Sequence, residues 1–146
     1  MRESPNDAGD GQKALVSAVG ARMRPLDAGR RAEDYAARYV ESLGWRILGR
    51  NVSNRYGEID IVAIDDADEL VLIEVRFRSI GMIQSPLDSV GPKKLRTLVR
   101  AGHALTEKMG WTGFWRIDLI GITDEKQRGE QKPKLEHIRD ITAGLL

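Results

Sequence analysis

Three charged residues lie inside two apolar segments whose patterns predict β-strands. Residues 57–79 read GEIDIVAIDDADELVLIEVRFRS, and the apolar runs of this stretch contain Asp60, Glu74 and Arg76. A buried carboxylate without a partner is costly, because the charge loses its hydration. These charges therefore compensate one another, face a cleft, or are held in place for a metal ion.

Together with Glu33, the two strand carboxylates would form a site that can do chemistry. Glu33, Asp60 and Glu74 offer oxygen ligands, and Mg²⁺ and Mn²⁺ prefer carboxylates and retained water. Such an ion activates water and stabilises the charge that develops on a phosphodiester under attack, while a neighbouring cation such as Arg76 neutralises the phosphate. This is nuclease chemistry. Taken singly, Asp60 is more commonly a turn cap, and Glu74 with Arg76 is more commonly a same-face ion pair.

Glu33 is positioned by a predicted helix that begins at Asp27 and ends near Gly44. Asp27 is expected as the N-cap and Gly44 as the C-terminal stop of this Ala-rich segment. By the i, i+3, i+4, i+7 rule, Glu33 shares a face with Ala36 and Val40. Its carboxylate should therefore point toward the interior of the protein.

The other charged residues are positioned by a predicted β-hairpin. Strands are expected over residues 45–52, 58–65 and 69–78. Because side chains alternate along a strand, Asp60 should share a face with Val62 and Ile64, while Glu74 and Arg76 share a face of the next strand. If the hairpin aligns these faces, the three charges converge at one end of one sheet surface.

The remaining sequence predicts a second helix and two further strands. We expect a loop with one helical turn before residue 92, and then a helix with Pro92 at its first position and Gly110 just past its end. A strand over 114–122, a polar loop over 124–134 and a short strand over 135–141 should follow. Residues 1–26 are expected to form a flexible tail and residues 27–146 a single domain. The predicted class is α/β.

Composition restricts the chemistry that the chain can perform. The 146 residues include no cysteine and two histidines, which excludes a thiolate nucleophile and cysteine-ligated zinc. Any metal should therefore bind oxygen. No apolar run approaches the roughly 18 residues that a membrane span needs, and the N-terminal stretch lacks a secretory apolar core. We expect a cytoplasmic protein without a membrane partner.

Positive charge is concentrated in one part of the chain although the formal net charge is only +1. Between Glu74 and Arg100, two acidic residues face six basic ones: Arg76, Arg78, Lys93, Lys94, Arg96 and Arg100. This stretch could contact phosphates, and a solvated basic helix face explains it as well.

Three more residues carry smaller expectations. Glu58 begins the strand of Asp60, and it is expected to hydrogen-bond beside the site. Arg116 and Asp118 share a strand face. They are expected to form an ion pair that braces the sheet.

The order of elements and charges resembles a known superfamily. An acid on the first helix, then D and ExK across a hairpin in an αβββαβ layout, resembles the PD-(D/E)XK restriction-endonuclease-like proteins. More narrowly, GRRAEDYAARYVESLGWRILGRN, GEIDIVA, LVLIEVRFR, SPLDSVGPKK and WRIDLI resemble the YraN family, itself similar to archaeal Holliday-junction resolvases. The resemblance covers about residues 28–141. It implies a restriction-endonuclease-like core with a central mixed sheet flanked by helices.

The resemblance also implies roles for single residues. Glu33, Asp60 and Glu74 fall at the positions of ligands to Mg²⁺ or Mn²⁺, and Asp60 and Glu74 are catalytic together with the cation two residues later. That cation is Arg76, where the superfamily has lysine. Lys94 matches a lysine that the family commonly has at the start of the second helix. With Arg78 and Lys93 from the basic stretch described above, the predicted nucleic-acid-binding residues are Arg76, Arg78, Lys93 and Lys94.

Arginine at this position leaves two functions open. A guanidinium stays protonated and cannot act as a base, although it can bind phosphate with two hydrogen bonds. One function is a metal-dependent endonuclease for structured or single-stranded DNA in recombination or repair. The other is a non-cleaving nucleic-acid-binding accessory module that works with a helicase or recombination partner. Resolvases of this type imply a homodimer, so that two sites reach paired strands.

Overall fold

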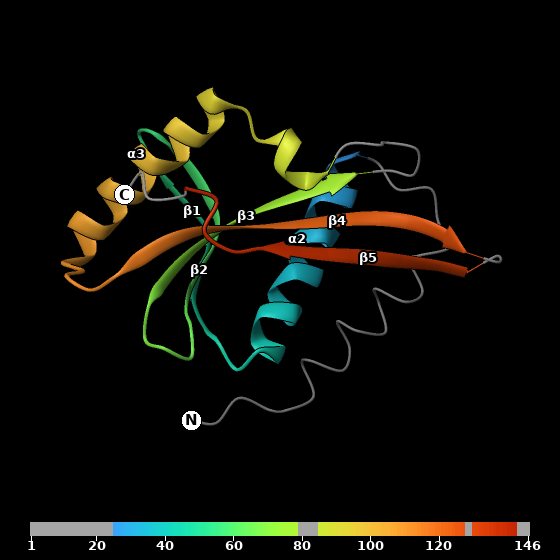
Figure 1. Ribbon diagram of the computed structural model, residues 1–146, viewed down its shortest axis with the longest axis horizontal. Coiled ribbons are helices and arrows are strands. Elements are labelled where there is room, and N and C mark those ends of the chain that lie inside the picture. The colour runs from blue at the N-terminus through green and yellow to red at the C-terminus, as the bar shows by residue number, and fades with distance from the viewer. Residues whose placement is uncertain (1–24, 79–84, 128–129, 143–146) are drawn as a thin grey trace.

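The computed structural model describes residues 25–78, 85–127 and 130–142, and the side chains of residues 28–78, 85–124 and 133–142. The elements, in chain order, are α2 (Pro25–Ser42), β1 (Arg46–Asn54), β2 (Gly57–Ile64), β3 (Leu70–Arg78), the short 3₁₀ helix η1 (Pro86–Ser89), α3 (Pro92–Met109), β4 (Trp115–Gln127) and β5 (Glu130–Ile138) (Figure 1).

The strands form one mixed sheet in the order β1-β2-β3-β4-β5. All neighbours are antiparallel except β3 and β4, which are parallel because α3 carries the chain from one to the other. The predicted α/β fold with a mixed sheet flanked by helices is confirmed, and it is compatible with a restriction-endonuclease-like core. Neither described helix is long and apolar enough to cross a membrane.

Each face of the sheet is covered by one helix. On one face, Ala36 and Val40 of α2 pack on a core that includes Ile61 and Ile73. On the other face, Leu98 and Ala101 of α3 pack on Ile59, Val62 and Leu72. Because β2 and β3 contribute to both cores, they read as apolar on both sides. Packing against α2 on one face and α3 on the other therefore fixes the positions of residues in β2 and β3.

The helix ends agree with the predictions in three cases out of four, and α3 begins at Pro92 as expected. Gly44 and Gly110 follow α2 and α3 with left-handed φ values of 82° and 68°, as expected of glycine stops. The predicted N-cap is wrong, because α2 begins at Pro25 and Asp27 lies inside its first turn. Proline suits a first helical turn, since it lacks the N–H that would stay unpaired there. Residues 1–24 of the predicted tail lie outside the described residues.

The polar loop predicted over residues 124–134 is wrong. Strand β4 continues to Gln127 and β5 begins at Glu130, so two long strands replace the loop and the short final strand. In Figure 1 they run side by side past the rest of the sheet. Their register extends to the pair Gln127↔Glu130, beyond the last pair with β3 at Thr123. Backbone hydrogen bonds hold this two-stranded extension together. Its residues are polar in sequence and show no apolar periodicity, so the sequence pattern does not predict it.

The regular alternation predicted for β2 is also wrong. Ile59 packs on the α3 side and Ile61 on the α2 side, although they are two positions apart and a regular strand would place them on one face. The partner strand changes at the same level: Arg50 binds Asp34 of α2, whereas Val52 packs on the α3 side. The β1–β2 strand pair thus turns over between these residues, which means that the face directed toward α3 at Ile59 is directed toward α2 at Ile61.

Arg116 forms the expected ion pair with Asp118, with 3.0 Å between Nε and Oδ1. Its Nη1 also lies 2.6 Å from Asp65 and 2.7 Å from Glu69, so one guanidinium joins three carboxylates. These hydrogen bonds, together with the backbone N–H of Glu69, lower the pKa of Asp65 against the opposing effect of burial. The network braces the β2–β3 turn against β4.

Candidate functional site

Carboxylates from α2 and β2 meet at the point where β2 turns over. Glu33, Glu58 and Asp60 each contribute one carboxylate oxygen, and these three oxygens lie within 4.8 Å of one another. Glu33 lies on α2 one turn before Ala36 and Ala37, which pack in the α2 core, so its side chain faces the sheet as predicted. Burial and repulsion from Asp60 raise the pKa of Glu33. The cluster is thus short of positive charge.

Asp60 fills the gap that opens between β2 and β3. The last paired residues of the two strands are Ile61 and Ile73, and beyond them Oδ2 of Asp60 accepts a 2.8 Å hydrogen bond from the backbone N–H of Val75. Burial, followed by repulsion from Glu74, raises the pKa of Asp60 to about 6. The hydrogen bond therefore holds a carboxylate in place where its charge is disfavoured.

Glu74 is the most buried carboxylate of the site and is bound by two cations. Its Oε1 lies 3.3 Å from Nε of Arg76 and 3.7 Å from Nζ of Lys94. Burial raises the pKa of Glu74, and the two cations oppose that effect. Arg76 comes from the same strand, whereas Lys94 reaches the carboxylate from the first turn of α3. This ion pair with Lys94 was not predicted.

Asn51 is a site residue that the sequence reasoning missed. With its amide nitrogen toward the carboxylates, it donates hydrogen bonds to Oε2 of Glu33 at 3.0 Å and to Oε1 of Glu58 at 3.1 Å. Its φ is 51°, a left-handed value that asparagine tolerates better than most residues. Asn51 lies between the pairs Arg50↔Ile61 and Val52↔Ile59, at the level where the strands turn over. An asparagine inside a strand is the signal that could have revealed it.

The predicted phosphate-binding residues lie along the rim of the same site. Arg78 is half-buried at the end of β3, on the side of the strand that carries Arg76. Nε of both arginines is buried and has no hydrogen-bond partner in the described part of the chain. Lys93 is exposed at the start of α3, next to Lys94. Because Nε of Arg76 is already ion-paired with Glu74, the unpaired Nε of Arg78 and the exposed Lys93 are the groups that suit an anionic ligand.

The residues present fit a divalent cation. The donors are all carboxylate oxygens, the ligand class of Mg²⁺ and Mn²⁺. Three of them, Glu33, Asp60 and Glu74, have pKa values raised first of all by burial. An ion would remove this disfavoured accumulation of negative charge. Glu33, Glu58 and Asp60 could ligate one ion, and Asp60 also faces Glu74.

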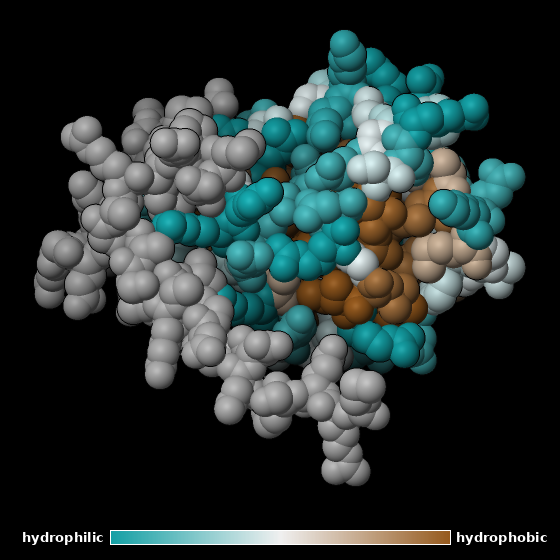
Figure 2. Space-filling view, turned by 180° about the vertical axis from the view of Figure 1, so that it is seen from behind, coloured by the Kyte–Doolittle hydropathy of each residue, from teal (hydrophilic) through white to brown (hydrophobic). Residues whose placement is uncertain are grey.

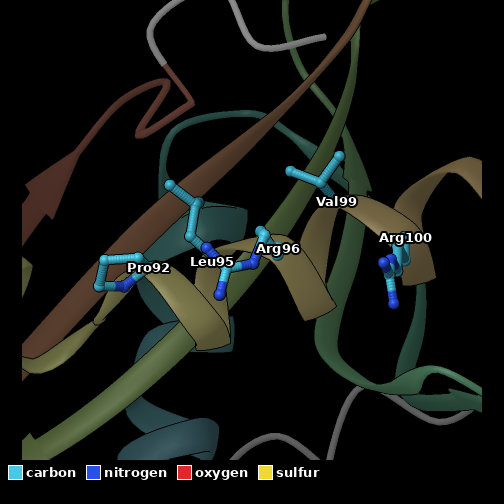
Figure 3. Close-up of a pocket in the computed structure, with 5 residues that line it drawn as sticks. All are labelled: Pro92, Leu95, Arg96, Val99 and Arg100. Carbon is cyan, nitrogen blue, oxygen red and sulfur yellow. The ribbon is translucent and has the colours of Figure 1, made fainter.

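The groove on α3 lies apart from these carboxylates. It has a volume of about 430 Å³ and is lined by Pro92, Leu95, Arg96, Val99 and Arg100. Figure 3 shows that all five project from this one helix. No carboxylate lines it, so it offers no metal ligands. Its two arginines extend the positive charge that begins at Lys93 and Lys94.

The predicted residues are brought together in two linked groups. Glu33 and Asp60 lie together with Glu58, which was expected only to hydrogen-bond nearby. Glu74 forms the second group with Arg76 and Lys94, and it is joined to the first through its repulsion of Asp60. The site therefore has an acidic side toward α2 and a mixed side toward α3.

Comparison with known proteins gives the family of the chain. The model of the uncharacterised protein family UPF0102 matches residues 32–122, a range that contains every site residue from Glu33 to Lys94. A UPF0102 protein of Marinobacter nauticus is 49% identical over 96 residues, which cover 65% of this chain and 77% of that protein. A UPF0102 protein of an Arthrobacter species is 39% identical over 121 residues, covering 82% and 99%. One of Anaeromyxobacter dehalogenans is 36% identical over 132 residues, covering 88% and 84%. The chain belongs to the UPF0102 family, also known as the YraN family.

Proposed function

We propose that the protein is a Mg²⁺- or Mn²⁺-dependent endonuclease that hydrolyses phosphodiester bonds in structured or single-stranded DNA, in recombination or repair. The observation that carries this proposal is the meeting of carboxylates from α2, β2 and β3 beside cations from β3 and α3. A plain stabilising network would pair its charges, whereas this one leaves carboxylates with raised pKa values. We also propose that the protein is cytoplasmic.

Each side of the site has a part in the reaction. Glu33, Asp60 and Glu74 would hold the ion. Glu58 has an oxygen within 4.8 Å of oxygens of Glu33 and Asp60, whereas Glu74 borders this group through Asp60. A bound divalent ion supplies activated water and stabilises the charge on the phosphate. In the reaction, the water oxygen bonds to phosphorus, the bond from phosphorus to one sugar oxygen breaks, water loses a proton to solvent, and the leaving oxygen gains one. Arg76, Arg78 and Lys93 bind phosphate oxygens and position the strand.

The direct test is cleavage of labelled single-stranded, flap and four-way-junction DNA with Mg²⁺ or Mn²⁺. Asp60→Asn is the informative variant, because an amide oxygen can still accept the Val75 hydrogen bond while the ligand charge is lost. Asp66→Asn, at an exposed turn position, is the matched control. We expect cleavage by the native protein and by Asp66→Asn, and its loss in Asp60→Asn. Metal-independent cleavage, or cleavage kept in Asp60→Asn, would refute the proposal.

A second candidate is the accessory module that binds nucleic acid without cutting it. Arg76 favours it, because a guanidinium cannot serve as a base. Figure 2 adds an apolar area among hydrophilic side chains, on the half of the molecule that carries α3, and such areas commonly contact partner proteins. A helicase or recombination protein is the class of partner proposed. If this candidate holds, native protein binds DNA without cutting it, and Arg76→Lys creates or strongly raises cleavage.

Both candidate functions require DNA binding, so a binding measurement alone does not distinguish between them. Arg78 and Lys93 should contribute phosphate contacts, so affinity should fall steeply as salt rises. The homodimer that we propose would present two sites to two strands. Light scattering after gel filtration tests it, with and without a junction, and a monomer in both conditions would exclude the dimer.

A further inference from the structure

Two cations from different elements contact the same oxygen of Glu74, and they differ in what they can do for a substrate. We infer that Lys94 provides the ammonium group that acts at the scissile phosphate, and that Arg76 serves to hold Glu74 and bind the strand. The ammonium lies 3.7 Å from Oε1 of Glu74, and the lysine side chain is 39% exposed. It is thus beside the buried carboxylate and open to solvent at once.

The position of Lys94 depends on the start of α3. Pro92 opens the helix and Gly91 precedes it in an extended conformation, and the first turn carries Lys94 to Glu74 in the middle of β3. Lys94 is the third residue of that turn and projects to the sheet, while its neighbour Lys93 is exposed and forms no ion pair within the described residues. Two adjacent lysines therefore have different surroundings, and one of them belongs to the site.

The geometry suits a hydrogen-bond donor that can turn toward a substrate. At 3.7 Å, Nζ is beyond the usual hydrogen-bond length to Glu74, so the contact is mainly electrostatic. An ammonium has three donors on a flexible stem and can be shared between Glu74 and a further acceptor. Arg76 has a planar group with its Nε closer to Glu74, at 3.3 Å. Arg76 is thus the closer of the two cations to Glu74 and, at 32% against 39%, the less exposed.

Lys94 would act as a donor and a positive charge throughout the reaction. It donates to the attacking water or to a non-bridging phosphate oxygen, where negative charge grows as the water oxygen bonds to phosphorus and the sugar oxygen departs. Its own proton stays in place, so the balance of the hydrolysis is unchanged. This role explains how a site with arginine after the ExK-type glutamate can still cleave. The inference rests on the proposed nuclease function.

The absence of cysteine from the chain allows a sharp test. Lys94→Cys introduces a single thiol, and alkylation with 2-bromoethylamine converts it into a lysine analogue with sulfur in the side chain. We expect Lys94→Cys to lower kcat by about 100-fold or more, the scale of one transition-state donor, with little change in KM. Alkylation, verified by mass spectrometry, should restore most of kcat.

Two other lysines of α3 supply the controls. Lys108→Cys, at the exposed far end of the helix, should cleave like the native protein before and after alkylation. Lys93→Cys should raise KM and leave kcat nearly unchanged, because that lysine is placed to bind the strand. A merely structural role for Lys94 would not give rescue by the analogue together with this split between kcat and KM.

Metal binding gives a readout that does not depend on activity. Removing a positive charge beside Glu74 should favour a cation, so Lys94→Met should bind Mn²⁺ about threefold to tenfold more tightly, measured by electron paramagnetic resonance. Lys108→Met should bind Mn²⁺ like the native protein.

The outcomes separate this inference from the proposed function. Native cleavage with an equally active Lys94→Cys would overturn the inference and leave the nuclease standing. Lost cleavage in Lys94→Cys without recovery after complete alkylation would also overturn it. Native protein that never cleaves would overturn both. Cleavage lost and then restored by alkylation, with tighter Mn²⁺ binding in Lys94→Met, would support both.

Discussion

Oδ2 of Asp60 accepts the backbone N–H of Val75 at 2.8 Å, directly beyond the last residue pair of β2 and β3. A side chain thus takes the hydrogen bond that a neighbouring strand would otherwise supply. This contact fixes the carboxylate in the sheet, where Glu74 repels it. Asp60 is therefore a structural acceptor and a charged group of the candidate site at the same time.

Removing the charge of Asp60 while keeping its acceptor should stabilise the metal-free protein. The pKa of about 6 lies above the ordinary 3.8, so the folded protein holds a proton between these values that the unfolded chain has lost. The ionised group therefore destabilises the fold above pH 6. We expect Asp60→Asn to raise the free energy of unfolding by about 2 kcal/mol at pH 8, and by less as the pH falls toward 4. Urea unfolding in EDTA at several pH values measures this, and a variant less stable than native at pH 8 would contradict it.

Asn51 gives a prediction about the acidic cluster. Asn51→Asp would replace an amide donor to Glu33 and Glu58 with a fourth carboxylate in the cluster. We expect it to destabilise the metal-free protein by up to about 1 kcal/mol, because solvent screens the repulsion at the exposed Asn51 and Glu58, and to gain more stability from Mn²⁺ than the native protein does. Thermal unfolding with and without Mn²⁺ provides the measurement. Asn51→Gly is the control, because glycine accepts the φ of 51° and adds no charge. Equal Mn²⁺ effects in both variants would argue against an ion beside Asn51.

Two helix glycines should respond in opposite directions to alanine. A Cβ at Gly102 of α3 would lie 2.5 Å from Cζ3 of Trp115 and 2.9 Å from Cδ1 of Leu72, whereas a Cβ at Gly29 of α2 would have no neighbour within 4 Å. Gly102→Ala should lose about 1–3 kcal/mol through overpacking, and Gly29→Ala should gain about 0.5–1 kcal/mol through helix propensity. Denaturant titrations of the two variants test this, and a stabilised Gly102→Ala would show that α3 can move away from the sheet.

The Arg116 network should dominate the ionic part of the stability. Asp118 is fully buried and also accepts from His137 and the backbone N–H of Asp140, and these bonds lower its pKa against the opposing effect of burial. Arg116→Met should cost about 3–5 kcal/mol, because it leaves buried carboxylates without their cation. Lys134→Met breaks an exposed pair with Glu136 and should cost less than about 0.5 kcal/mol. Similar losses in chemical unfolding of the two variants would show that the network does little.

The parts of the fold that follow from local patterns could be predicted from the sequence. The helix faces of α2 and α3, the glycine stops at Gly44 and Gly110 and the hairpin of β2 and β3 were all set by periodicity and by backbone conformations that glycine accepts. Asp60 and Glu74 could be singled out because a charge in an apolar strand needs a reason. Their roles as metal ligands stay a proposal.

The features that were missed depend on contacts between distant segments. The polar second half of β4 is joined to the polar start of β5 through the backbones, and polar side chains do not reveal such pairing. The contact of Lys94 with Glu74 depends on how α3 crosses the sheet, which no short window of sequence contains. Asn51 acts through a left-handed φ, and asparagine only permits that conformation without requiring it.

Because β2 turns over at Asp60, the packing of both hydrophobic cores and the position of the site depend on the same short segment. Ile59 belongs to one hydrophobic layer and Ile61 to the other, with Asp60 between them. Deleting or inserting one residue here would exchange the two layers as well as displace the carboxylate. Length variation in this strand should therefore be far less acceptable than substitution. The aspartate is kept in place by the packing on both sides of the sheet, whatever reaction it serves.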